Sequence, residues 1–114
     1  MTSVTLPSLI RGDTWDGISS ISITVDGSPP IYPVASARIH FRRKPAANII
    51  GHSLDSEDDS ILILDAAGWS FQAPPQALPL GTGLWYWDFE TVDTEGTIKT
   101  YVFGTITIIQ DVTR

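Results

Sequence analysis

The stretch GLWYWDFETV, residues 83–92, alternates between large apolar and polar side chains. Trp85, Trp87 and Phe89 fall on one side of an extended chain, and Tyr86 falls on the other. A period of two is typical of a β-strand with one buried face. The turn sequence DTEG (93–96) follows, and then a second apolar run, so residues 83–112 predict a long hairpin. Gly104, in the middle of the second arm, predicts a bulge or the close approach of another backbone.

Strand patterns also precede this hairpin, whereas helical periodicity is almost absent. Ile23, Ile39, Phe41 and Phe71 occupy alternate positions and are predicted to share a core with the three aromatic residues of 83–92. The continuous apolar run 61–64 predicts a strand covered on both sides. The Pro- and Gly-rich stretch 74–83 predicts a crossover without β-pairing. The expected strands before the hairpin cover residues 4–11 (with Pro7 at a sheet edge or a bulge), 18–25, 34–43, 48–52, 61–64 and 69–73.

Seven or eight short strands separated by turn signals predict an all-β fold. The pattern favours an immunoglobulin-like antiparallel β-sandwich of about 7–8 strands, because a strand, a Pro-rich corner and a long strand follow one another over residues 69–92. The length of 114 residues suits one domain, residues 1–114.

Composition excludes several classes of function. The chain has no cysteine, which excludes disulfides, thiolate metal sites and cysteine nucleophiles. The formal charge of −6 argues against nucleic acid as a partner. The start of the sequence does not resemble a signal peptide, and no apolar run is long enough to cross a bilayer, so no membrane association is expected.

Two groups of side chains are of the types that metal binding or catalysis uses. The acidic run 55–59 offers carboxylates to calcium, but it lacks the spacing of a calcium loop, and a solvated loop is the favoured interpretation. His40 and His52 have no second ligand at metal-binding spacing. No nucleophile elbow or phosphate-binding loop occurs. The sequence therefore predicts no enzyme, no cofactor and no metal.

Two features could serve binding. Arg38, His40, Arg42 and Lys44 form a basic stripe along one face of an expected strand. The stripe is either a docking surface for an acidic partner or an ordinary hydrated strand face. Tyr86 should face away from the core, which makes it a second interface candidate.

Five short segments carry a resemblance to a known family: LIRGDTW (9–15), ARIHFR (37–42), GLWYWDFE (83–90), GTITI (104–108) and DVTR (111–114). They resemble small tail-associated proteins of phages and prophages, and their order is similar to that in the N-terminal domain of phage baseplate upper proteins. In that family a β-sandwich of this size attaches a receptor-binding or fibre region to the baseplate.

The resemblance implies a non-catalytic virion structural protein of the phage tail or baseplate, working through protein–protein contacts. Its expected partners are other phage virion proteins or further copies of the same chain. Its expected location is the virion, after synthesis in the cytoplasm of the bacterial host. The alternative from the residues themselves is a carbohydrate-binding β-sandwich that uses exposed aromatics such as Tyr86 or Trp15.

Overall fold

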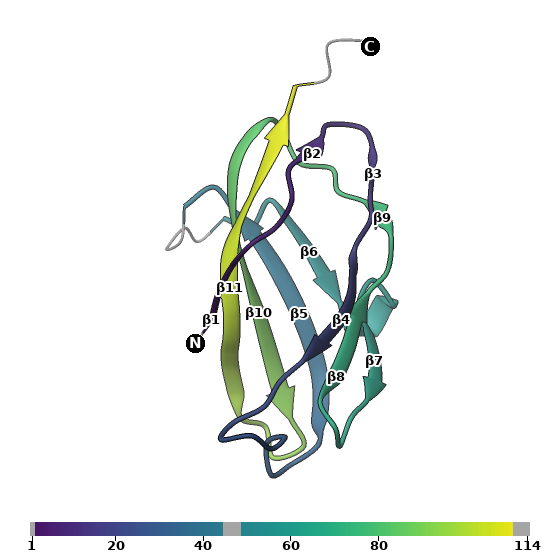
Figure 1. The fold of residues 1–114 in the computed structure, drawn as a ribbon, viewed down its shortest axis with the longest axis vertical. Coiled ribbons are helices and arrows are strands. Elements are labelled where there is room, and N and C mark those ends of the chain that lie inside the picture. The colour runs from purple at the N-terminus through teal and green to yellow at the C-terminus, as the bar shows by residue number, and fades with distance from the viewer. Residues whose placement is uncertain (1, 45–48, 111–114) are drawn as a thin grey trace.

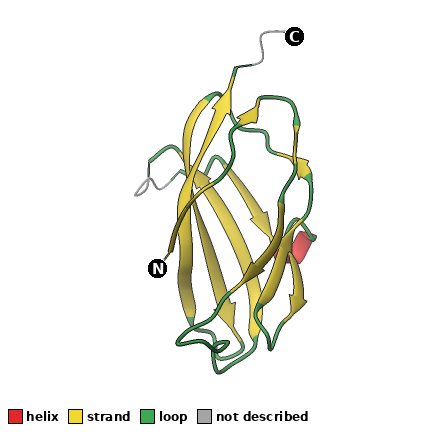
Figure 2. Cartoon of the chain, viewed as in Figure 1, coloured by secondary structure: helices red, strands yellow, loops and turns green. Residues whose placement is uncertain are grey.

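The computed structural model describes residues 2–44 and 49–110, which form an all-β fold of two main sheets facing each other (Figure 1). In the described part of the chain, the one helical element is the short 3-10 turn η1 (Ser56–Asp58) (Figure 2). The predicted all-β class is confirmed. The strands are β1 (Thr2–Thr5), β2 (Leu9–Ile10), β3 (Thr14–Trp15), β4 (Ile18–Ser22), β5 (Val34–Arg42), β6 (His52–Asp55), β7 (Leu62–Asp65), β8 (Ser70–Ala73), β9 (Gln76–Ala77), β10 (Gly83–Asp93) and β11 (Ile98–Ile109).

The larger sheet has the strand order β1-β11-β10-β5-β6, and β2 also pairs with β11. The hairpin predicted for residues 83–112 is present as β10 and β11, and residues 111–112 lie outside the described residues. The pairing is antiparallel except at one edge, where β1 and β2 both run parallel to β11. The expected single strand 4–11 is therefore two strands, interrupted where Pro7 cannot donate a backbone hydrogen bond.

The smaller sheet has the order β4-β8-β7, and β3 and β9 form a separate two-stranded ladder. This ladder corrects one prediction, because Gln76 of β9 pairs with Trp15 inside the stretch expected to be unpaired. A second prediction is also wrong. Residues 61–64 are not covered on both sides, since β7 lies at the sheet edge and leaves Leu64 56% exposed. The edge strand expected over 48–52 begins later, at His52, and residue 48 lies outside the described residues.

The core forms where the two main sheets face each other, as the alternation predicted. Trp85, Trp87 and Phe89 are 7%, 5% and 1% exposed. The rings of Phe71 and Phe89 meet edge to face, with centroids 5.0 Å apart, and so join the smaller sheet to the larger one. The other residues expected in this core are also buried: Ile23, Ile39 and Phe41.

Gly104 marks a close approach of two strands. A Cβ atom on this residue would lie 1.6 Å from the carbonyl oxygen of Val4 in β1, and 3.1 Å from the Trp87 ring. The first distance is far below any van der Waals contact. The prediction of a close backbone approach at Gly104 is confirmed, and only glycine lets β1 pair at this point.

A bulge lies a few residues earlier in β11. Phe89 pairs with Val102, but the next residue, Glu90, pairs with Thr100, which leaves Tyr101 as an extra residue. Both Tyr101 and Val102 pack against the core in consequence.

The two open sides of the sandwich differ. On the side of β6 and β7, the loop through η1 closes the gap, and Ser56 Oγ accepts a hydrogen bond from the backbone N–H of Ala37 at 3.1 Å. Leu54 and Ile61 are almost fully buried there. On the side of β1 and β4, no strand formed by residues 2–44 and 49–110 bridges the two sheets. No helix in the described residues is long and apolar enough to span a membrane.

Candidate functional site

The predicted binding residues lie on the outer face of the larger sheet, the face that points away from the smaller sheet. β5 contributes Arg38, His40 and Arg42, and the neighbouring strand β10 contributes Tyr86. The register places Tyr86 beside Arg42, because the two strands pair residue by residue along this stretch. The structure therefore brings four of the five predicted residues onto one surface.

The arginines of this face are ion-paired. Arg38 Nε lies 2.8 Å from Glu90 Oε1, and Arg42 Nη1 lies 2.9 Å from Asp88 Oδ2. The basic stripe expected from the sequence is thus corrected to an alternation of both charges. The two carboxylates, Asp88 and Glu90, come from β10, and only the strand register matches them to arginines about fifty residues earlier in the chain.

His40 lies between these pairs. Its Nδ1 accepts a hydrogen bond from Nη2 of Arg42 at 3.2 Å, since a guanidinium group has only donors. Burial, and then the positive charge of Arg42, lower the pKa of His40 below its ordinary value of 6.5. The ring is therefore held neutral near pH 7 and takes part in the hydrogen-bond network of the face.

Exposed apolar side chains lie beside the charged pairs. Phe103 of β11 is directly opposite Asp88 in the register and is 42% exposed. Tyr86 is half-buried and lies diagonally from Phe103, within reach of an aromatic ring. Leu84 is exposed two residues before Tyr86, on the same side of β10. Together the three residues form an apolar strip that crosses β10 and β11, and alternation along β11 could have predicted it.

The last predicted residue, Lys44, is exposed just beyond the end of β5. Its neighbour Arg43 departs from the face altogether, because its guanidinium carbon lies 4.0 Å from the centre of the Trp85 ring. Lys44 therefore lies at the end of the predicted stripe and belongs to neither of the ion pairs that Arg38 and Arg42 form.

The acidic run is held by its own hydrogen bonds. Asp55 Oδ1 accepts the backbone N–H of Glu57, and Asp58 Oδ1 accepts the backbone N–H of Ser60, each at 3.0 Å. The hydroxyl of Ser60 also donates to Asp58 Oδ1, and this bond, followed by the backbone bond from Ser60, lowers the pKa of Asp58. The described residues contain no group of three or more His, Asp or Glu side chains placed to hold a metal ion.

Trp15, one of the aromatics expected to be exposed for sugar binding, is 5% exposed and belongs to the core. The prediction that Trp15 is exposed is wrong, because its strand β3 pairs with β9 and the indole turns inward. Of the two aromatic residues named for carbohydrate binding, Tyr86 is therefore the one that remains accessible.

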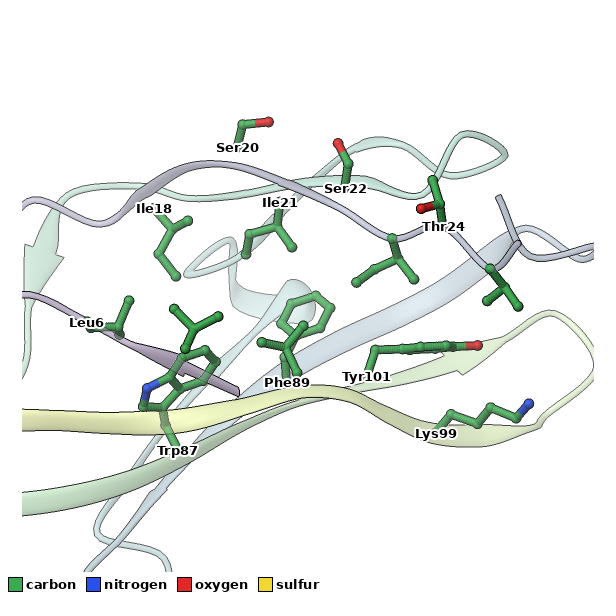
Figure 3. A pocket seen from close by; sticks show the side chains of 14 residues that line it. Leu6, Ile18, Ser20, Ile21, Ser22, Thr24, Trp87, Phe89, Lys99 and Tyr101 are labelled. Atoms are coloured by element: carbon green, nitrogen blue, oxygen red, sulfur yellow. The ribbon is translucent and has the colours of Figure 1, made fainter. Parts of the chain in front are cut away.

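A cleft that the sequence did not predict opens between the two sheets on the unbridged side (Figure 3). It has a volume of about 720 Å³. β4 forms one wall, and β1, β10 and β11 form the other, so residues more than seventy positions apart meet in it. No periodicity reveals such a cleft, because it depends on the sheets having different widths.

Comparison with known proteins gives no relative. No family model, no curated protein and no solved structure matches this chain.

Proposed function

We propose that this chain is a non-catalytic structural module of a phage or prophage tail or baseplate, and that it docks on other virion proteins through the outer face of the larger sheet. The supporting observation is the make-up of that face. The apolar strip of Leu84, Tyr86 and Phe103 runs beside two cross-strand ion pairs. The phage setting itself rests on the sequence resemblance.

An apolar centre next to a polar margin is how specific protein interfaces are built. Phe103 and Leu84 are large apolar residues whose side chains are exposed on this face and do not belong to the core. The neighbouring Arg38 and Arg42 already have partners, so they contribute alignment more than net attraction. A partner with complementary charge order and an apolar patch would fit this face, and that partner is either another virion protein or a second copy.

We further propose that the sandwich is immunoglobulin-like. Support comes from the face-to-face packing of the two sheets, from the terminal hairpin at the centre of the larger sheet, and from β1 running parallel to β11 at its edge. In this arrangement one face of β10 and β5 packs on the core, and the opposite face presents the proposed docking surface.

The phage setting is tested on particles. Virions are purified after prophage induction of the bacterium that carries the gene, then examined by mass spectrometry and by immunogold microscopy with an antibody against this chain. The proposal expects a stoichiometric protein and gold label at the tail. Intact virions that lack the protein would refute it.

The docking face is tested with point variants in those particles and in light scattering at two salt concentrations. Phe103→Arg should abolish incorporation or self-association, because it places a charge in the apolar strip. Ile31→Arg is the matched control, since Ile31 is 93% exposed and lies in the loop between β4 and β5, outside the apolar strip. Equal loss in both variants, or none in Phe103→Arg, would remove the outer face from the proposal.

The ion pairs allow docking to be separated from stability. Arg38→Glu with Arg42→Glu places four carboxylates together and should weaken both fold and docking. Adding Glu90→Arg and Asp88→Arg restores oppositely charged pairs with their order reversed. The four-residue variant should recover the stability of the parent while docking stays impaired, because the partner still presents the original charge order.

A further inference from the structure

The inter-sheet cleft, lined by β4 on one side and by β1, β10 and β11 on the other, has an apolar floor that the fold leaves partly uncovered. Leu6, Ile21 and Val102 are only half-buried although they pack against the core. Val4 is 38% exposed. The remaining apolar lining residues are Ile18, Ile23, Val25, Trp87, Phe89 and Tyr101.

The reason for this exposure is the unequal width of the sheets. The path of the larger sheet is five strands wide, whereas the smaller sheet has three. β11 and β1 therefore extend beyond β4, and no strand of the described residues covers their inner faces on that side. One more strand beside β4 would cover the floor.

The backbone of β4 is arranged to accept such a strand. β4 is the edge of the smaller sheet and pairs only with β8 among the described strands. Ile23, just after β4, donates its backbone N–H to Trp69 O at 3.1 Å, so its alternate neighbours Ser22 and Thr24 direct their backbone groups the other way, toward the mouth of the cleft. Unpaired edge groups are a template for an incoming strand.

The side chains agree with this arrangement. In Figure 3, Ile18 and Ile21 point into the cleft toward Trp87 and Phe89, while the hydroxyls of Ser20 and Ser22 point away from it.

One end of the cleft carries a positive charge. Among the described residues that line the cleft, Lys99 of β11 is the one charged residue, and it lies beside Tyr101 (Figure 3). Neither of the two ion pairs formed within residues 2–44 and 49–110 includes Lys99. An occupant with a carboxylate near this end would complement it.

We infer that the inter-sheet cleft binds an extended segment of a partner protein, which adds to β4 as a fourth strand, turns alternate apolar side chains onto the floor, and places an acidic group beside Lys99. A segment of about six residues, roughly 20 Å long, would follow β4 and the residues after it. The volume alone would also suit a small apolar molecule. Such a molecule would leave the backbone groups of Ser22 and Thr24 unpaired, whereas a strand satisfies them. This inference does not rest on the proposed function, because it uses the opposite side of the larger sheet.

The test begins with a displayed library of random nonapeptides selected on the immobilised protein. The selected peptides should alternate apolar and polar residues and carry Asp or Glu at one end. In ¹⁵N NMR spectra the best peptide should shift the backbone amides of Ser22 and Thr24. The same peptide, N-methylated on the amides that would face β4, should bind at least about tenfold more weakly, and this control leaves the protein unchanged.

A charge exchange tests the polarity of the site. Lys99→Glu should weaken the acidic peptide and strengthen a peptide in which Lys replaces its acidic residue. Lys44→Glu is the matched control, because Lys44 is exposed but lies outside the cleft. It should change neither affinity by more than about twofold, apart from salt-dependent screening.

Three results would overturn the inference. The first is a library without an enriched sequence, and the second is an N-methylated peptide that binds as well as its parent. The third is a dimer in light scattering that the selected peptide dissociates, which would make a second copy the occupant. Failure here leaves the virion experiments untouched, and a negative result in those would leave the peptide binding untouched.

Discussion

Replacing Gly104 by alanine should detach β1 from the larger sheet. The added methyl group would lie 1.6 Å from Val4 O, and a carbonyl oxygen of the backbone cannot turn away as a side chain can. Gly104 does not have a positive φ, so alanine is compatible with its local conformation and the cost is steric. Either β1 or β11 must therefore move by more than an ångström.

The size of the effect follows from what β1 contributes. Four residues of β1 are in register with β11, from Thr2 opposite Val102 to Thr5 opposite Thr105. At a net value of about 0.5–1 kcal/mol for each backbone hydrogen bond, releasing β1 should lower the free energy of unfolding by about 2–4 kcal/mol. Exposure of Val4 and of the Trp87 ring adds to the upper end of this range.

Urea unfolding followed by tryptophan fluorescence measures the loss, and hydrogen exchange of the amides of residues 3–6 locates it. Gly96→Ala is the control, because no atom lies within 4 Å of the added methyl group and only its φ of +82° is unfavourable. It should lose about 1 kcal/mol and keep β1 protected. A Gly104→Ala protein that loses less than about 0.5 kcal/mol with β1 still protected would refute the reasoning.

Three further predictions concern the core and the outer face. Trp87→Ala should lower the free energy of unfolding by about 3–5 kcal/mol in urea melts, because it empties a buried site between the sheets; a loss below 1 kcal/mol would contradict the assigned strand faces. A double-mutant cycle of Arg42→Ala and Asp88→Ala should give a coupling of no more than about 1 kcal/mol, since both side chains remain partly exposed, and a much larger coupling would show that water is excluded from the pair. Burial lowers the pKa of His40 and of His52 in the folded protein. Below pH 6.5 the unfolded chain therefore binds more protons than the folded protein does. The free energy of unfolding should accordingly be highest above pH 6.5 and fall as the pH drops through the folded pKa values. Urea midpoints at pH 7.5 and pH 5.5 measure this dependence, and His40→Gln should reduce it; an unchanged slope would show that His40 does not contribute.

The sequence predicted the faces of the long strands well, because burial on one side imposes a period of two. Trp85 and Trp87 point inward and Tyr86 outward, as the alternation required. The close approach at Gly104 was also predictable, since a glycine in an apolar strand lacks the side chain that packing would otherwise use.

Pairing between strands was harder to predict, because it depends on register and not on periodicity. The ladder of β3 and β9 has two residues on each side, too few for any alternation. Parallel pairing of β1 with β11 leaves no signature different from antiparallel pairing at a sheet edge. The partner of Arg38 could not be chosen among thirteen acidic residues until the structure placed Glu90 directly opposite it. The inter-sheet cleft could not be predicted for the same reason, because its walls are set by which strands pair in each sheet.

The pairing of β1 with β11 has a consequence for the order of folding. Thr2 lies opposite Val102, so the two strands are separated by about one hundred residues of chain. At roughly 5–20 residues per second, a ribosome completes β11 some 5–20 s after β1. Throughout that interval β1 has no strand to pair with, and the floor of the larger sheet is incomplete. In nascent chains arrested before β11, proteases and chaperones should therefore have access to the segment that becomes β1. This access should end once the hairpin of β10 and β11 has left the ribosome and β1 can pair with it.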